Sequence, residues 1–113
     1  MLGAVSVAQK QSKLAPKYAS AHYNLGRCYL DQGLFQKAFG SVNKAVSLDA
    51  NFTDDVFVLA NIHIQLGQIK VAEAGYRKVV AQAPGHFEAW NNRRNALQEL
   101  GEYHNRYKDL VAH

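Results

Sequence analysis

The feature that most constrains the fold is a repeat of 34 residues. When residues 19–52 are aligned with residues 53–86, small and apolar residues coincide along their length. Glycines recur at the same interval, as Gly33, Gly67 and Gly101. An ordinary helical bundle has similar apolar stripes but no such fixed period. The repeat therefore predicts a solenoid of stacked units rather than a generic bundle.

Each repeat is predicted to form two helices joined by a short loop. Apolar residues between Tyr18 and Leu30 recur at three- and four-residue steps, which is the period of an α-helix. Gly33 is expected to end this helix, because glycine adopts the left-handed backbone conformation at little cost. The next helix carries its apolar face from Phe35 to Leu48. The short loop makes the two helices antiparallel.

Residues of matching type return at fixed places in three successive registers. The first register carries the fullest set, the second keeps most of it, and the third keeps the least. Two prolines, separated by twice the period, are expected to stop the second helix of their repeats, since proline lacks an amide hydrogen. These residues are Leu25, Gly26, Tyr29, Gly33, Ala38 and Ala45; then Leu59, Ala60, Gly67, Ala72, Tyr76 and Pro84; then Trp90, Leu97, Gly101 and Tyr103; and Pro16 ahead of them.

This period and pattern resemble the tetratricopeptide-repeat family. The resemblance implies an all-α fold, a right-handed superhelix of antiparallel helix pairs with about seven helices. It implies a single domain over residues 1–113. Within it, residues 2–14 would be a half-repeat helix, 19–52 and 53–86 two repeats, and 87–113 an incomplete, irregular third repeat.

The third repeat departs from the pattern at its tight helix crossing. Arg94 and Arg106 stand where the first two repeats carry glycine or alanine. Two arginines facing each other there would bury like charge, which is costly without partners. Three accommodations are open. The final helix, Tyr103–Val111, swings out; the arginines reach solvent at a polar cap; or an acidic residue such as Glu99 or Asp109 pairs with them.

An apolar stripe in the last helix would lack an internal partner if that helix swings out. Such a stripe is a candidate surface for self-association, and hence for a homo-oligomer. Its residues are Tyr103, Tyr107, Leu110 and Val111.

The resemblance also implies where a ligand binds, because first helices of successive repeats line the concave face in this family. Asparagine side chains there can both donate to and accept from a peptide backbone, and the apolar residues offer area for anchoring side chains. The residues at lining positions are Tyr23, Asn24, Arg27 and Asp31; Asp54, Phe57, Val58, Asn61, Ile64 and Gln65; and Asn91, Asn92, Asn95 and Gln98.

Two binding modes of the family can be compared with these residues. The carboxylate clamp for chaperone tails ending in EEVD requires several basic residues. Its places hold Tyr23, Arg27, Val58, Glu88 and Asn92, of which only Arg27 is basic, so we reject that clamp. The asparagine ladder of O-linked N-acetylglucosamine transferase is closer. Asn24 and Asn92 match that ladder and Val58 interrupts it, which favours binding of an extended peptide.

Composition and residue spacing argue against most other functions. The net charge of +4 is spread along the chain, so we do not expect nucleic acid as a partner. The five histidines and the single cysteine, Cys28, show no metal-ligand spacing, and no phosphate-binding loop is present. We expect no catalytic residue, no cofactor, no metal and no small-molecule substrate. No signal peptide or membrane-spanning segment is predicted, and a cytoplasmic location is expected.

The sequence thus predicts a non-catalytic scaffold that binds a peptide or protein segment in its concave groove. One alternative is a structural scaffold that self-assembles through its C-terminal helix. Another is a regulatory domain of a larger enzyme, such as a glycosyltransferase.

Overall fold

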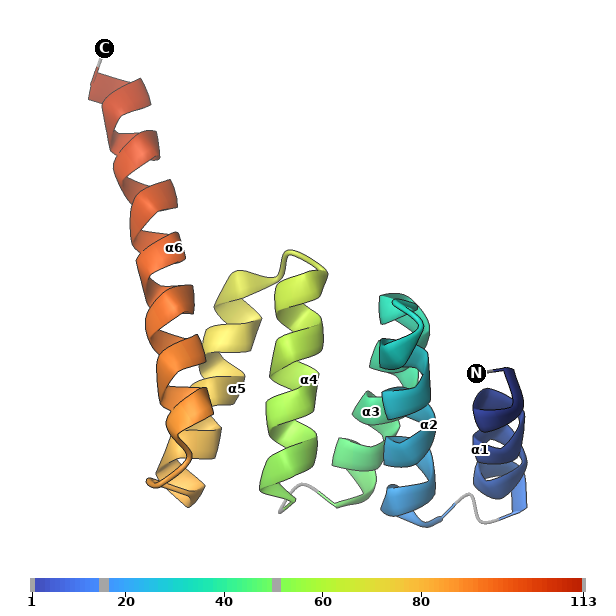
Figure 1. The fold of residues 1–113 in the computed structure, drawn as a ribbon. Helices are drawn as coiled ribbons and strands as arrows, with labels where there is room; N and C mark the ends of the chain where they lie inside the picture. Colours follow the sequence, from blue (N-terminus) through green and yellow to red (C-terminus); the bar gives the residue numbers. More distant parts are fainter. Residues whose placement is uncertain (1, 15–16, 50–51, 113) are drawn as a thin grey trace.

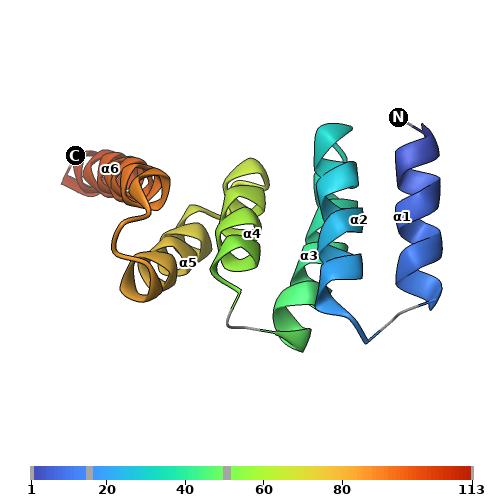
Figure 2. The ribbon, with the colours of Figure 1, turned by 60° about the horizontal axis from the view of Figure 1, so that its bottom comes forward.

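The chain forms an elongated, all-α stack of antiparallel helices, as the repeat predicts (Figure 1). The structure is a computed structural model and describes residues 2–14, 17–49 and 52–112. Each helix packs mainly against its neighbours in sequence, so the row extends from α1 to α6 (Figure 2). The helices are α1 (Leu2–Leu14), α2 (Ala19–Asp31), α3 (Phe35–Leu48), α4 (Thr53–Gln65), α5 (Ile69–Gln82) and α6 (Phe87–Ala112).

The dimensions of the molecule reflect this stacking. Its principal extents are 58 × 29 × 20 Å, and its radius of gyration is 16.2 Å. A compact chain of this length would have a radius of gyration of about 13 Å. The core is therefore a continuous row of contacts between successive helices and has no single centre.

Two glycine turns close the helix pairs α2–α3 and α4–α5. Gly33 has φ 73°, a left-handed conformation that glycine adopts without a Cβ clash. Its N–H donates to the carbonyl of Leu30 (2.9 Å), and the N–H of Leu34 donates to the carbonyl of Tyr29 (3.0 Å). This pair of bonds is a Schellman motif, which satisfies the last carbonyls of the helix. The same pair closes the turn at Gly67, where φ is 78°.

Small residues allow the paired helices to approach closely. Ala38 and Ala72 are fully buried, as the repeat register predicts. A Cβ added to Gly26 would overlap Cγ2 of Val42, itself fully buried. A Cβ on Gly75 would lie 3.0 Å from the Cβ of its neighbour on α4. Larger residues at these crossings would push the helices apart.

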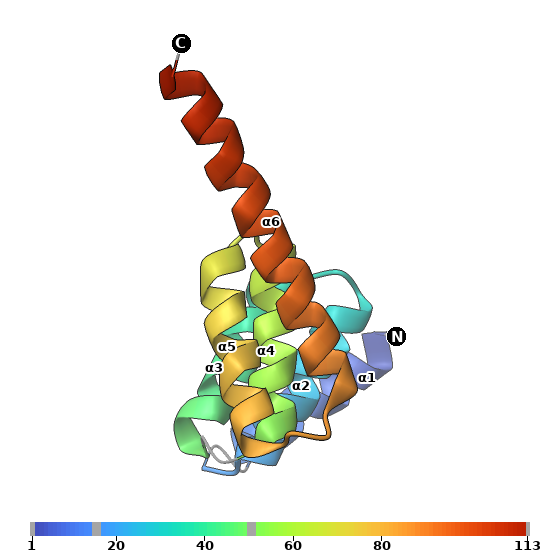
Figure 3. The ribbon, with the colours of Figure 1, turned by 90° about the vertical axis from the view of Figure 1, so that its left-hand side faces the viewer.

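The C-terminal third of the chain corrects one expectation. We predicted about seven helices, with a separate last helix, Tyr103–Val111, after the recurring glycine at position 101. The described residues instead form six helices, and α6 continues through Gly101 without a break. Among the described glycines, only Gly33 and Gly67 have positive φ. The second half of α6 therefore extends past the other helices (Figure 3).

The two arginines supply the physical reason for the straight helix. A turn at Gly101 would carry Arg106 to the place that Ala38 and Ala72 occupy, where both alanines are fully buried. It would face Arg94, which holds the place of Gly26, and two unpaired buried charges would result. In the straight helix both arginine side chains are exposed to solvent, in agreement with the second accommodation.

An ion pair next to Arg94 in sequence holds the first half of α6 against α5. Arg93, which replaces a leucine of the first two repeats, donates from Nε to Oε2 of Glu73 over 3.1 Å. Oε1 of Glu73 lies 3.7 Å from Nη2 of Arg77. The third accommodation, a pairing of Arg94 or Arg106 with Glu99, is not found, and the side chain of Asp109 lies outside the described residues.

Two other sets of predicted residues also lie outside the described ones. Pro16 is not among the described residues, and no side chain of the predicted self-association stripe, Tyr103, Tyr107, Leu110 and Val111, is described. No helix in the described part of the chain has both the length and the apolar character that crossing a bilayer requires.

Candidate binding groove

Two adjoining hollows lie along the first helices of the repeats. The first hollow lies between α2 and α4, is also lined by residues at the start of α6, and has a volume of about 400 Å³. It combines aromatic rings with charged side chains. Its lining consists of Tyr23, Arg27 and Leu30; Asp54, Phe57, Val58 and Asn61; and His86 and Glu88.

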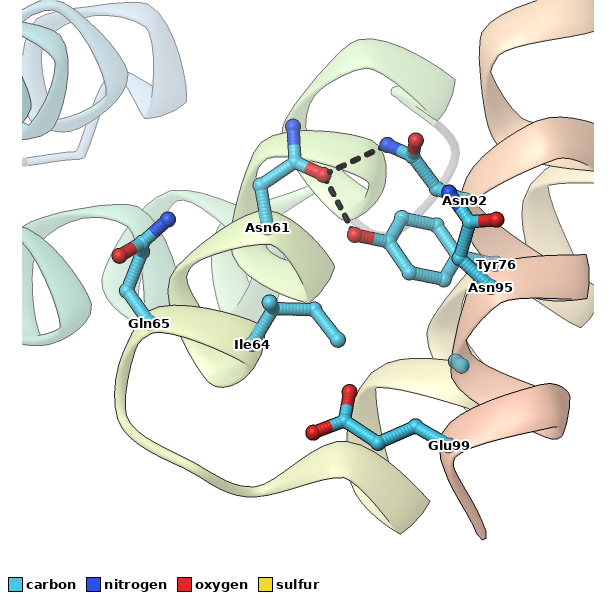
Figure 4. Close-up of a pocket in the computed structure, with 8 residues that line it drawn as sticks. Asn61, Ile64, Gln65, Tyr76, Asn92, Asn95 and Glu99 are labelled. Atoms are coloured by element: carbon cyan, nitrogen blue, oxygen red, sulfur yellow. Dashed lines mark hydrogen bonds between the residues drawn. The ribbon is translucent and has the colours of Figure 1, made fainter. Parts of the chain in front are cut away.

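The second hollow lies between α4 and α6 and has a volume of about 360 Å³ (Figure 4). Tyr76 of α5 reaches it between the two helices. Amide side chains dominate its lining, with one carboxylate at the far end. Its lining consists of Asn61, Ile64, Gln65, Tyr76, Asn92, Asn95, Ala96 and Glu99.

Asn61 belongs to both hollows and is held in place by two hydrogen bonds. The hydroxyl of Tyr76 donates to its Oδ1 over 2.5 Å, and Nδ2 of Asn92 donates to the same oxygen over 3.2 Å (Figure 4). Tyr76 is only 1% exposed, and this burial raises its pKa to about 12. The hydroxyl is therefore a neutral donor at physiological pH. The carbonyl of Asn61 is occupied, whereas its Nδ2 points away from both partners.

Aromatic contacts shape the first hollow. The ring of Phe57 lies 4.5 Å from the ring of His86 and 5.8 Å from the ring of Tyr76, measured between centroids. Nδ1 of His86 accepts a hydrogen bond from the backbone N–H of Ala89 (3.1 Å), so His86 satisfies a free donor at the start of α6. The helix terminus therefore fixes the position of one wall.

Arg27 is engaged within the first hollow. Its Nη1 donates to the hydroxyl of Tyr23 over 3.0 Å, and its guanidinium lies 5.8 Å from the centre of the same ring. The hydrogen bond to Tyr23 raises the pKa of Arg27, and the charges of Asp31 and Asp54 raise it further. The guanidinium is thus a fixed positive charge attached to its own helix.

The two hollows together are acidic, although the whole chain is basic. Three carboxylates, Asp54, Glu88 and Glu99, and one guanidinium, Arg27, line them. Counting His86 as neutral, the lining has a formal charge of −2, whereas the chain has +4. Negative charge is therefore concentrated on the face that holds the groove.

The groove offers binding groups but no metal-binding cluster. Within the part of the chain that the structure describes, no three His, Cys, Asp or Glu side chains come together in a way that could hold a metal ion. Cys28 is partly buried, and its thiol lies 3.8 Å from the carbonyl oxygen of Ala4.

Comparison with known proteins identifies the family. Two family models, both described as tetratricopeptide repeat, match residues 19–52 and 56–86. The matched residues make up more than half of the chain. The chain belongs to the tetratricopeptide-repeat family. Repeats of this family typically serve as protein-interaction scaffolds.

Individual relatives agree with this assignment. Human peptidyl-prolyl cis-trans isomerase FKBP4 is 29% identical over 93 residues, which are 82% of this chain and 20% of that protein. This chain thus spans about a fifth of the length of that relative. The crystal structure of MamA superimposes with a TM-score of 0.82 at 23% identity, covering 86% of this chain and 57% of that one.

A third relative was solved with a ligand. The first tetratricopeptide-repeat domain of Spaghetti (RPAP3), bound to the HSP90 peptide SRMEEVD, superimposes with a TM-score of 0.80 at 24% identity. The match covers 86% of this chain and 79% of that one. At this level of identity the likeness shows a shared tetratricopeptide-repeat fold.

Most of the residues predicted to line the tetratricopeptide groove lie in the two hollows, and several do not. Asn24 lines a separate hollow with Gln11 and Tyr18 of the neighbouring segment. Asp31, Asn91 and Gln98 are exposed and line neither hollow. The hollows contain the remaining predicted residues, Tyr23, Arg27, Asp54, Phe57, Val58, Asn61, Ile64, Gln65, Asn92 and Asn95.

Sequence reasoning missed several lining residues, and helical spacing could have found two of them, Glu88 and Glu99. Glu88, Asn92, Asn95 and Glu99 follow one another at steps of four, three and four, so they share one face of a helix. Tyr76 could not be found in this way, because it lies on a second helix and its place in the repeat predicts a core residue. The other missed residues are Leu30, His86 and Ala96.

Proposed function

We propose that this chain binds an extended segment of a partner protein in the groove formed by the two hollows. The observation that carries this proposal is their continuity: both include Asn61, and together they follow α2, α4 and α6. An extended peptide crossing these helices would contact each in turn, as expected of a groove built by successive repeats.

The chemistry of the lining suits a peptide. Nδ2 of Asn61 and the exposed amides of Gln65 and Asn95 can bond backbone groups of an extended chain, which carries one donor and one acceptor per residue. Phe57 and Ile64 are partly exposed and offer apolar area to ligand side chains. The peptide held by the RPAP3 domain supports the same class of ligand.

The test is a selection of short peptides on the purified protein, followed by affinity measurements with fluorescence anisotropy. The double variant Gln65→Ala with Asn95→Ala should weaken binding by about tenfold, because each lost hydrogen bond contributes about 0.5–1.5 kcal/mol. Both side chains are exposed, so the fold should be unchanged in circular dichroism.

A matched control uses the same chemistry outside the groove. Asn24→Ala with Asn91→Ala also removes two exposed amides from first helices, but neither residue lines the two hollows. This control should bind the selected peptides with unchanged affinity. If both double variants weaken binding equally, or neither does, the groove is not the binding site.

A second proposal is self-association through α6. Beyond Gly101 this helix extends past the rest of the molecule (Figure 3), and the described side chains of this half are exposed. We propose that two copies pair along this half, with Tyr103, Tyr107, Leu110 and Val111 as the contacting residues predicted from the sequence. Pairing would remove an apolar stripe from water.

Light scattering across a wide concentration range tests this pairing. A dimer should form as concentration rises, and Tyr107→Asp with Leu110→Asp should abolish it. His104→Asp with Asn105→Asp, which adds acidic groups at neighbouring exposed positions, is the control and should leave the dimer intact. A monomeric mass at every concentration would exclude the proposal.

A further inference from the structure

We propose that the groove selects a partner segment that carries arginine or lysine side chains and discriminates against an acidic segment. This inference rests on the groove being the binding site, as proposed above. It adds the chemical class of the ligand, and it differs from the acidic peptide in the RPAP3 complex.

The first argument is the contrast between the groove and the rest of the chain. The lining carries a formal charge of −2 in a chain of +4. Both hollows contain carboxylates, with Asp54 and Glu88 in the first and Glu99 in the second. A concave surface of one sign raises the local concentration of the opposite charge and speeds its association.

The second argument is that two of these carboxylates, Glu88 and Glu99, lack basic partners within the described part of the chain, whereas the charge of Asp54 raises the pKa of Arg27. Neither Glu88 nor Glu99 forms an ion pair with any described residue. By contrast, Glu73, which lines neither hollow, lies against two arginines. Glu88 and Glu99 are thus left available to a cation from a ligand.

The third argument is the position of Arg27, the one basic residue of the lining. Its guanidinium is hydrogen-bonded to Tyr23 in the first hollow, whereas Glu99 lines the second. One of the five N–H donors of this guanidinium is therefore already used within the chain. A single engaged guanidinium is a poor receptor for an acidic tail, which is best held by several free cations.

Aromatic rings in the first hollow add to the preference for a cation. Phe57 and His86 lie 4.5 Å apart by ring centroids and line the same hollow as Asp54 and Glu88. The alkyl stem of a lysine or arginine would pack on these rings while its charged head reaches the carboxylates. The hollow therefore matches both parts of a basic side chain.

The experiment uses two labelled peptides of equal length, built from alanine, leucine and glutamine. One carries two arginines, and the other carries two glutamates at the same positions. The arginine peptide should bind about tenfold more tightly at low salt, and the difference should shrink as salt rises, because exposed charges are screened beyond about 10 Å at 0.1 M. Peptides obtained in the selection on the purified protein should also be enriched in arginine and lysine.

Variants assign the preference to the groove. Glu88→Gln with Glu99→Gln should lower the affinity for the arginine peptide by about five- to tenfold, since each exposed ion pair contributes modestly. The same variant should bind the glutamate peptide no worse than the parent does. Glu102→Gln removes an exposed carboxylate of α6 that lines neither hollow, and it should change neither affinity.

The outcomes separate this inference from the groove proposal. Suppose that the glutamate peptide binds as well as the arginine peptide, and that both lose affinity in Gln65→Ala with Asn95→Ala. The charge preference is then wrong and the groove still binds. If the arginine peptide does not bind and selected peptides lack basic residues, the preference is also wrong. If the selected peptides bind both groove variants with unchanged affinity, both proposals are wrong.

Discussion

The hydrogen bond between Tyr76 and Asn61 joins the binding groove to the core, and its removal should destabilise the fold. Oδ1 of Asn61 accepts from a tyrosine hydroxyl whose residue is 1% exposed. Asn61→Ala would leave that hydroxyl buried without its acceptor. A groove variant chosen only from the sequence would thus weaken the protein as well as its binding site.

The magnitude follows from what each substitution leaves behind. An unsatisfied buried hydroxyl costs about 1–3 kcal/mol, so Asn61→Ala should lower the free energy of unfolding by that amount. Tyr76→Phe removes the donor itself, and Oδ1 of Asn61 still accepts from Asn92, so its cost should be about 0.5–1.5 kcal/mol. When Tyr76→Phe is already present, Asn61→Ala should cost less than about 1 kcal/mol.

Urea unfolding followed by circular dichroism gives these free energies for the four members of the cycle. Gln65→Ala is the matched control: it removes an amide one turn further along α4, where the side chain is exposed, and should change stability by less than about 0.5 kcal/mol. If Asn61→Ala costs the same with and without Tyr76→Phe, the two side chains are not coupled. The assigned role of the hydrogen bond would then be refuted.

Three further predictions concern the core. Burial, with two neighbouring aspartates, raises the pKa of Asp55 to about 6 from 3.8, so protonation favours the folded state. Its stabilising contribution is present below pH 3.8 and is lost as pH rises through 6. Asp55→Asn should therefore stabilise the protein by about 1–3 kcal/mol at pH 7 and little at pH 3.5, and equal effects at both pH values would contradict this. Gly26→Ala should destabilise the fold by about 1–3 kcal/mol, because the added Cβ overlaps Val42. Gly40→Ala should stabilise the fold by about 0.5–1 kcal/mol, because nothing lies within 4 Å of the added Cβ. Thermal melts that rank these two variants the other way would contradict this. Glu73→Gln should cost about 1–2 kcal/mol in urea unfolding because a partly buried arginine loses its partner, and an unchanged midpoint would argue against that role.

Much of the groove could be predicted, because its residues follow from helical register. Once the first helices are located, residues four or three positions apart share a face, and this brings Asp54, Phe57 and Asn61 together. Register alone could not show that Asn24 and Asn91 line neither hollow, because the limits of the hollows depend on how far each helix is covered by the next. It also could not show that a tyrosine from α5 reaches the groove.

The sequence by itself determined the helix pairs and their glycine turns. These depend on local chemistry: apolar residues at helical spacing, and glycines that alone accept the left-handed turn at positions 33 and 67. Only the tertiary structure decided that α6 does not turn at the matching Gly101. That outcome depends on whether Arg94 and Arg106 could be buried against each other, and this is a property of packing between residues that are distant along the chain.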